Sequence, residues 1–309
     1  MTKVFIDGNS GTTGLRIYER LSERRDVELL VLPDEVRKEA ARRAEMYSRA
    51  DVVFLCLPDE AAKEAVALAG ETGAKAVIID SSTAHRTAPG WTYGFPELYG
   101  QREKIANSKR IANPGCHASG FIALVRPLVE KGLIRPDARL SCTSLTGYSG
   151  GGKKMIAEYE DASRSPLLDA PRLYGLTQTH KHLPEMKEYC RLDFPPVFCP
   201  VVAPYKCGME VIVPLTRDDF RGTVSEITSA YEGYYRSGLI RVNTGSSESG
   251  FLSSGAFSGR DDMELSVYGG ENGLTLISRF DNLGKGASGS AIQNFNIITG
   301  TDETEGLVV

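Results

Sequence analysis

The chain has 309 residues, with 36 Lys and Arg against 40 Asp and Glu, and a net charge of −4. A slightly acidic chain has no broad positive field for a phosphate backbone, so its composition argues against nucleic acid as the main partner. The length suits two domains, because single cores tend to stop growing near roughly 250–300 residues. The N-terminal residues lack a signal-peptide core and no long apolar run follows, so we expect a soluble, cytoplasmic protein without a membrane segment.

The first third of the chain alternates short apolar runs with helical patterns. The runs DVVFLCL and AVIID are apolar nearly throughout, which is typical of strands buried on both faces of a parallel sheet. The alternation predicts an α/β fold with a Rossmann-like, doubly wound parallel sheet. The predicted strands are 3–7, 27–33, 51–58 and 75–82, and the predicted helices are 14–24, 35–49 and 60–73.

A glycine-rich turn, GNSGTTG, separates the first predicted strand from the first predicted helix. Glycines allow close approach of the backbone to a ligand, and free N–H groups at a helix start attract an anion such as a pyrophosphate. The spacing is GxxGxxG rather than GxGxxG, so a turn without a ligand is the alternative. The predicted dinucleotide-binding residues of this turn are Gly8, Ser10, Gly11, Thr12, Thr13 and Gly14.

The residues that would contact the ribose lie about 20 positions beyond the turn. Asp34 stands there and would favour the free 2′-hydroxyl of NAD. Arg37 and Lys38 follow and would favour the 2′-phosphate of NADP, unless they only form a solvated helix face. These residues leave the choice between NAD and NADP open.

The stretch IANPGCHASG places Cys116 directly after a Pro-Gly turn and at the start of an apolar helical run. A helix N-terminus would lower the pKa of this thiol and favour the nucleophilic thiolate. The alternative is a buried cysteine that serves only as a small hydrophobic residue. His117 is adjacent, but neighbours on a helix point about 100° apart, so it is not the obvious base.

Beyond about residue 140, β-branched and aromatic segments alternate with Gly, Pro and Asn. This pattern predicts a mixed α+β domain with a largely antiparallel sheet, a helix over 223–237 and a last helix over 285–300. The segment THKHLPE brings His180, His182 and Glu185 together as a possible proton donor or acceptor with an orienting acid. Structural histidines are the alternative, and a zinc site is weaker because further ligands are missing, so we expect no metal.

A bound nicotinamide, a cysteine thioester and a histidine acid/base would together convert a carboxyl derivative to an aldehyde. Four motifs occur in order: GNSGTTG, NPGC (113–116), HKHLPE (180–185) and DNLGKGASG (281–289). With these motifs the chain resembles the N-acetyl-γ-glutamyl-phosphate reductases, in the shorter branch of that family. The resemblance implies NADPH-dependent reduction of N-acetyl-γ-glutamyl phosphate to N-acetylglutamate semialdehyde and phosphate, a step of arginine biosynthesis.

The resemblance also assigns roles. Cys116 matches the family nucleophile, and His180 or His182 matches the acid/base, with His180 preferred. It implies a dinucleotide-binding domain over 1–115 that the C-terminal segment 285–309 rejoins, a catalytic and oligomerisation domain over 116–284, and a homo-oligomer, either dimer or tetramer. The implied cofactor residues further along the chain are Ser82 and Asn294, and the implied substrate or phosphate residues are Arg86, Asn113, Ser149, Lys153 and Glu185.

Three other functions compete with this one. Aspartate-semialdehyde dehydrogenase shares the plan but is expected to place its histidine far toward the C-terminus, whereas no His follows His182 here. A regulatory protein that binds NAD(P) without chemistry would give no reason for PGC and HxHxPE to occur together. A cysteine hydrolase that binds no cofactor would have no function for the glycine turn.

Overall fold

The computed structural model describes residues 1–236 and 238–309, which form two compact units. The first unit contains 1–96, 100–114 and 287–307, and the second contains 97–99, 115–286 and 308–309. Each unit is built on one sheet.

The first unit is a six-stranded parallel sheet in the order β2-β1-β3-β4-β6-β5. The doubly wound parallel sheet predicted from the apolar runs is confirmed. Its strands are β1 (Thr2–Asp7), β2 (Val27–Leu30), β3 (Val52–Leu55), β4 (Val77–Asp80), β5 (Thr92–Tyr93) and β6 (Arg110–Ala112). Its helices are α1 (Thr12–Ser22), α2 (Ala40–Arg49), α3 (Asp59–Glu71), α4 (Gln101–Ala106) and α9 (Gly289–Thr299).

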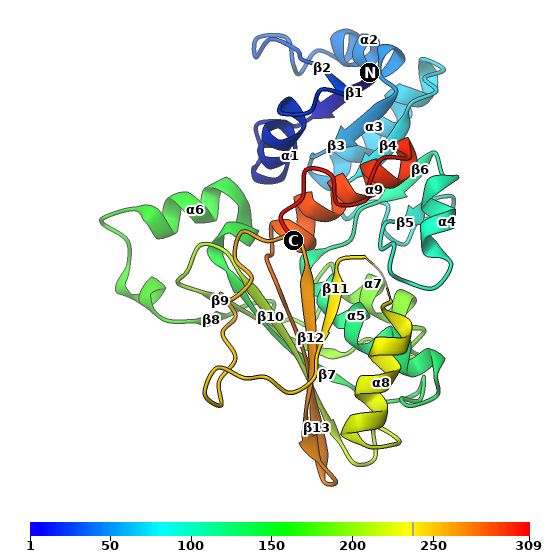
Figure 1. Cartoon of the computed structure of the whole chain (residues 1–309). Helices are drawn as coiled ribbons and strands as arrows, with labels where there is room; N and C mark the ends of the chain where they lie inside the picture. Colours follow the sequence, from blue (N-terminus) through cyan, green and yellow to red (C-terminus); the bar gives the residue numbers. More distant parts are fainter. Residues whose placement is uncertain (237) are drawn as a thin grey trace. The chain divides into compact units, whose positions relative to one another are not determined.

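Both faces of this sheet are covered, because side chains alternate along each strand. Val4 and Ile6 point into a cluster with Phe295 of α9, whereas Phe5 between them points into a second cluster with Tyr47 of α2. Figure 1 shows α9, in red, beside α1 and β4, although it comes from the end of the chain.

The helix predicted over 35–49 begins later than expected, at Ala40. Residues 33–39 form turns instead, with the Val36 N–H donating to the Pro33 carbonyl and the Glu39 N–H donating to the Val36 carbonyl. The turn leaves Arg37 and Lys38 in a loop beyond the end of β2.

The second unit is a seven-stranded mixed sheet in the order β11-β12-β13-β10-β7-β9-β8. Four pairings are antiparallel, and the pairings β11–β12 and β7–β9 are parallel. Its strands are β7 (Ser141–Gly147), β8 (Arg172–Leu173), β9 (Val197–Ala203), β10 (Met209–Thr216), β11 (Ile240–Asn243), β12 (Met263–Gly270) and β13 (Gly273–Phe280). Its helices are α5 (Cys116–Glu130), α6 (Gly152–Glu160), α7 (Leu183–Cys190) and α8 (Val224–Tyr234), with short helical turns at Tyr148–Gly151 and Pro166–Asp169. A further helical turn, Gly284–Ser288, begins in the second unit and ends in the first. The predicted mixed sheet is confirmed, and the helix expected over 223–237 ends at Tyr234, with residue 237 outside the described part.

Helices α5 and α8 pack on the sheet of the second unit, α5 against β10 and β13 and α8 against β12 (Figure 1). Gly120 lets α5 come close to the sheet, because a Cβ there would lie 2.5 Å from Val211 Cγ2 and 2.9 Å from Phe280 Cε1. This close packing fixes the start of α5, where Cys116 lies.

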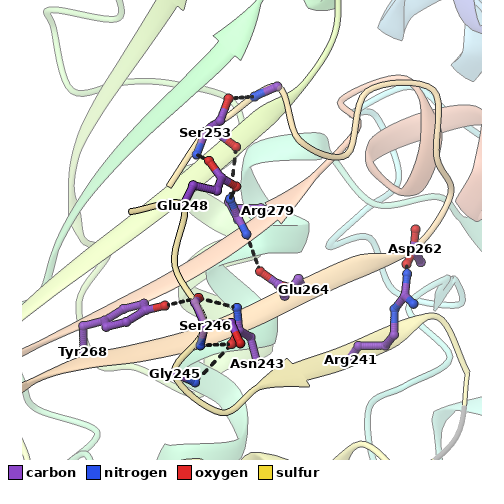
Figure 2. A network of polar contacts seen from close by, with 11 residues as sticks. Arg241, Asn243, Gly245, Ser246, Glu248, Ser253, Asp262, Glu264, Tyr268 and Arg279 are labelled. Carbon is purple, nitrogen blue, oxygen red and sulfur yellow. Dashed lines mark hydrogen bonds and ion pairs between the residues drawn. The ribbon is translucent and has the colours of Figure 1, made fainter. Parts of the chain in front are cut away.

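A long irregular segment joins β11 to β12 and is tied to the sheet by buried Arg279 of β13 (Figure 2). Arg279 forms ion pairs with Glu248 of the segment and with Glu264 of β12, both at 2.6 Å. The Tyr268 hydroxyl donates to the Ser246 carbonyl at 2.6 Å. The segment is therefore held by the sheet as well as by its two ends.

All six cysteines are free thiols. Over 1–236 and 238–309, no group of three His, Cys, Asp or Glu side chains is arranged to hold a metal ion. Within the same residues, none of the helices has the length and apolar character needed to cross a membrane.

Candidate active site

In the first unit the glycine turn brings backbone close to backbone. Gly8 has φ +92°, and a Cβ on it would lie 2.3 Å from the Cys56 carbonyl oxygen. A Cβ on Gly14 would lie 2.4 Å from the Gly8 carbonyl oxygen, and the Gly11 N–H donates to that same carbonyl at 3.0 Å. Gly11 caps α1, so Thr12, Thr13 and Gly14 form the first turn of this helix. A glycine turn at a helix start is typical of a pyrophosphate site.

A cavity of about 180 Å³ lies beside this turn. The glycine turn contributes Gly8 and Ser10 to its wall, and the loop after β2 contributes Arg37 and Lys38. Asp34 is not among the lining residues and forms an ion pair at 3.3 Å with Arg37. Two cations at the cavity, beside a glycine turn, fit the anionic groups of a dinucleotide.

A cluster missed by sequence reasoning braces the end of β1. Buried Asp7 forms an ion pair with Arg43 at 2.8 Å and accepts a hydrogen bond from the Tyr47 hydroxyl, both partners lying on α2. Burial and the Asp7 charge raise the pKa of Tyr47, so this phenol remains a donor. The sequence held no local signal for it, because 36 or more residues separate the partners.

The loop after β4 holds Ser82 and Arg86 through buried contacts. Asp80 accepts from the Ser82 N–H at 2.9 Å and from the Ser82 hydroxyl at 2.7 Å, and its other partner is His85 Nδ1 at 2.6 Å. The Arg86 guanidinium donates to the Asn113 carbonyl at 3.0 Å and to the Ser81 carbonyl at 3.2 Å. The predicted residues therefore form part of a braced loop.

Asn113 and Asn294 meet within the first unit. The Asn294 amide donates to the Gly94 carbonyl at 3.0 Å and to Asn113 Oδ1 at 3.2 Å, and the Asn113 amide donates to the Ala287 carbonyl at 2.9 Å. Both side chains are buried, and their hydrogen bonds hold together the segments around Gly94, Asn113 and 287–294 of this unit.

In the second unit the start of the cysteine helix and the histidine segment are joined by a hydrogen bond. Cys116 is the first residue of α5, after the cap residue Gly115. The Gly115 N–H donates to Glu185 Oε2 at 3.1 Å, and Glu185 Oε1 lies 4.0 Å from His182 Nε2. Glu185 is fully buried, so its carboxylate fixes the HKHLPE segment against the start of the cysteine helix.

Three imidazoles pack together at this point. The ring centroids of His117 and His180 are 5.6 Å apart, those of His117 and His182 5.5 Å, and those of His180 and His182 4.8 Å. The backbone N–H of His182 donates to His180 Nδ1 at 3.2 Å. His180 is half-buried and His182 is buried, so they differ in access to water.

His117, set aside as a base in the sequence, is built into a buried hydrogen-bond chain. Its Nδ1 lies 2.7 Å from Ser144 Oγ on β7, and its Nε2 lies 2.7 Å from the Tyr174 hydroxyl. Burial and the neighbouring His180 lower the pKa of His117 to about 3, so the ring is neutral at ordinary pH. Tyr174 could not be identified from the sequence as a partner of His117, because 57 residues separate the two.

The two remaining predicted substrate residues differ in their surroundings. Ser149 is buried and its hydroxyl accepts from the Asn282 amide at 2.9 Å, while Asn282 Oδ1 accepts from the Gly208 N–H at 3.0 Å. Lys153 is exposed at the start of α6. Asn282 thereby links the 148–151 turn to the DNLGKGASG motif.

That motif contains a π-helical turn, Gly284–Ser288. Single π-helical turns of this kind often occur at functional sites. Lys285 within it is fully buried and pairs with Glu97 at 2.6 Å. At the next residue, Gly286, a Cβ would lie 2.8 Å from Cys116 Cβ. The turn therefore packs directly on the candidate nucleophile.

Comparison with known proteins places these features in a family. Residues 3–108 match the semialdehyde dehydrogenase NAD binding domain, and residues 116–282 match the semialdehyde dehydrogenase dimerisation domain. The chain belongs to the semialdehyde dehydrogenase family. As an oxidoreductase of this family, it carries the nicotinamide dinucleotide domain that the glycine turn predicts.

Similar proteins support the narrower resemblance. The chain is 42% identical to N-acetyl-gamma-glutamyl-phosphate reductase 2 of Nostoc sp., covering 99% of both chains. It is 46% identical to N-acetyl-gamma-glutamyl-phosphate reductase of Brucella anthropi, covering 96% of this chain and 98% of that one. Its fold resembles aspartate semialdehyde dehydrogenase II of Vibrio cholerae, crystallised with ASA, with TM-score 0.73 and 18% identity over 97% and 98% of the chains. The resemblance to the N-acetyl-γ-glutamyl-phosphate reductases is confirmed.

Proposed function

We propose that this family member reduces N-acetyl-γ-glutamyl phosphate with NADPH, giving N-acetylglutamate semialdehyde and phosphate in arginine biosynthesis. The observation that carries the proposal is the hydrogen bond from the Gly115 N–H to Glu185, which joins the helix of Cys116 to the histidine segment. The names of relatives more than 40% identical over nearly the whole chain support this substrate over an aspartyl one.

The residues of the first unit suit an NADP molecule. The glycine turn would hold the pyrophosphate, and Arg37 and Lys38 at the cavity would hold the 2′-phosphate. The Asp34 carboxylate already pairs with Arg37, so a ribose hydroxyl would have to share it with the guanidinium. The dinucleotide, when bound, supplies the hydride that reduces the acyl group. Ser82 and Asn294 remain predicted cofactor residues.

Cys116 would act as the nucleophile. Its place at the first turn of α5 favours the thiolate, because the helix N-terminus carries partial positive charge. The sulfur attacks the acyl carbon of the substrate, the carbon–oxygen bond to the phosphate breaks, and inorganic phosphate leaves with the electron pair. The thioester that forms is the species to be reduced, and breaking its carbon–sulfur bond after reduction returns the thiolate.

His180 would carry the proton. It is half-buried, so it can exchange protons with water, whereas His182 is buried beside Glu185 and would orient the segment. The imidazole accepts the Cys116 proton as the thiolate forms and gives it to the departing phosphate, and a proton taken up from water replaces it for the next turnover. Backbone N–H groups after Cys116 would stabilise the oxyanion.

Further assignments follow from the resemblance. Arg86, Asn113, Ser149, Lys153 and Glu185 are proposed to bind or orient the substrate and its phosphate. We also propose that 1–115 with 285–309 binds the dinucleotide and that 116–284 carries catalysis and oligomerisation. A dimer or tetramer suits the dimerisation-domain match, and free thiols suit a cytoplasmic enzyme.

The test is a steady-state assay of phosphate-dependent semialdehyde oxidation. We expect turnover of N-acetylglutamate semialdehyde with NADP, much weaker turnover with NAD or aspartate semialdehyde, and none in Cys116→Ala, which still quenches NADPH fluorescence. Preference for aspartate semialdehyde would instead support the rival dehydrogenase. Cofactor binding without turnover of any semialdehyde would support a regulatory protein, and appreciable turnover by Cys116→Ala would remove the covalent mechanism.

A further inference from the structure

The last residue of β1 brings a negative charge to the cavity beside the glycine turn. Asp7 directly precedes Gly8, and both residues line this cavity together with Arg37 and Lys38. A carboxylate there repels the phosphates of a dinucleotide, because each of them is also negatively charged. Asp7 is buried, so solvent screens its charge less than that of a surface carboxylate. An acid in this wall therefore needs a compensating positive charge.

Two side chains of α2 meet the Asp7 carboxylate. Arg43 Nε donates to Asp7 Oδ2 at 2.9 Å, and Arg43 Nη2 lies 2.8 Å from the same carboxylate oxygen. The Tyr47 hydroxyl also donates to Oδ2 and accepts from Arg43 Nη2 at 3.1 Å. Of these two partners, only Arg43 carries a positive charge, so only Arg43 can balance the charge of Asp7.

The Arg43 guanidinium is committed to this pair rather than to the cavity. Asp7 lines the cavity, whereas Arg43 does not, and the Arg43 side chain is only 14% exposed. Arg37 differs, because it lines the cavity and its partner Asp34 is exposed. An effect of Arg43 on a bound dinucleotide would therefore act through the charge of Asp7 and not through direct contact.

We propose that Arg43 is the charge-compensating residue of the dinucleotide site. It neutralises Asp7, so that the phosphates of the dinucleotide can approach the glycine turn. Asp7 in return ties α2 to the end of β1 through its bonds to Arg43 and Tyr47. The inference rests on the cofactor site of the proposed function, but not on the identity of the semialdehyde.

The experiment is a fluorescence titration with NADPH in low salt near pH 8, where carboxylates are ionised. At the effective dielectric constant near a protein surface, one unit charge about 10 Å from another changes Kd roughly tenfold. Arg43→Met should therefore raise Kd roughly tenfold, and Asp7→Asn should lower it by up to roughly tenfold. The double variant Asp7→Asn/Arg43→Met should return to within about threefold of the parent protein, because its charges balance again.

Salt and conservative variants separate charge compensation from packing. In roughly 0.5 M NaCl, the difference between Arg43→Met and the parent protein should shrink to below about threefold, because salt screens charges. A loss caused by altered packing would persist in salt. Arg43→Lys keeps the charge and Tyr47→Phe removes none, so each should bind NADPH within about threefold of the parent protein.

Arg102→Met is the matched control. Arg102 donates to both carboxylate oxygens of Glu303 at 2.8 Å in the same unit, and neither residue lines the cavity. This variant also loses one arginine charge and one ion pair to a carboxylate. It should leave the Kd of NADPH unchanged, because the exposed charge lies away from the cavity wall.

The inference is overturned if Arg43→Met binds NADPH as tightly as the parent protein, or if Arg102→Met weakens binding equally. It is also overturned if the double variant binds no better than Arg43→Met, since Arg43 would then act without Asp7. If Arg43→Met does not fold, Asp7→Asn decides, because weaker binding by that variant contradicts the proposal. A protein that binds NADPH but turns over no semialdehyde would refute the proposed function while leaving this test intact.

Discussion

The contact of Gly286 with Cys116 allows a substitution whose effect follows from geometry. A Cβ on residue 286 would lie 2.8 Å from Cys116 Cβ, 3.2 Å from the Asp281 carbonyl oxygen and 3.3 Å from Phe280 Cε2. Carbon atoms pack at about 3.5–4.0 Å, so Cys116 or the π-helical turn must shift by roughly 1 Å. Asp281 also holds this turn through the Leu283 and Gly284 N–H groups, so the turn resists moving and the thiol is the part displaced.

Gly286→Ala should therefore lose activity out of proportion to stability. Misplacing a reacting atom by about 1 Å costs on the order of 10² in rate, whereas overpacking costs about 1–3 kcal/mol of unfolding free energy. The assays are semialdehyde turnover, Cys116 alkylation and urea unfolding. Gly70→Ala is the control, because no atom lies within 4 Å of the added Cβ on this helical glycine. If folded Gly286→Ala keeps the turnover rate and the Cys116 alkylation rate of the parent enzyme, this turn does not position the thiol.

Three further predictions use other parts of the site. Arg37→Ala should weaken NADP binding roughly tenfold or more while NAD binding changes little, measured by fluorescence titration, because it removes from the cavity a cation proposed to hold the 2′-phosphate; equal losses for both would argue against that role. His180→Asn should lower kcat by roughly 10²–10⁴, and His182→Asn by less, in steady-state assays; the reverse order would move the proton to His182. The pKa of His117 is lowered to about 3 from 6.5. Below pH 6.5 the unfolded chain therefore binds a proton that the folded chain does not. As the pH is lowered from 6.5 to 3, the free energy of unfolding should then decrease by up to about 1.4 kcal/mol per pH unit. Urea unfolding at pH 7 and 5 should show a smaller drop for His117→Gln, and an identical drop would show that His117 is not the group responsible.

Much of the fold could be predicted from the sequence because burial leaves a pattern. The strand 52–55 is apolar at every position and buried at every position, which only the interior of a parallel sheet requires. The predicted start of α2 was wrong. The mostly charged residues 35–39 have good helix propensity, but after Pro33 their backbone N–H groups form turn hydrogen bonds instead of helical ones. Local turn hydrogen bonds outweigh helix propensity there.

The site was predictable only where its residues are close in sequence. His180, His182 and Glu185 could be identified as a group because they share one short motif. The rule that set His117 aside holds for direct contact with the neighbouring thiol, but says nothing about a partner such as Tyr174 that arrives from another loop. Long-range partners are set by strand order, which the pattern of apolar residues does not encode.

The position of Cys116 is fixed from three directions within the second unit. Glu185 holds the N–H of the preceding residue, the chain through His117 holds the following residue to β7, and Gly286 packs on its Cβ. A thiolate held this way loses little further freedom when substrate binds, so more of the binding energy is available in the transition state. Because both substitutions act on the position of the same thiol, rate losses from Gly286→Ala and His117→Leu should be less than multiplicative, and fully multiplicative losses would show that the two contacts act independently.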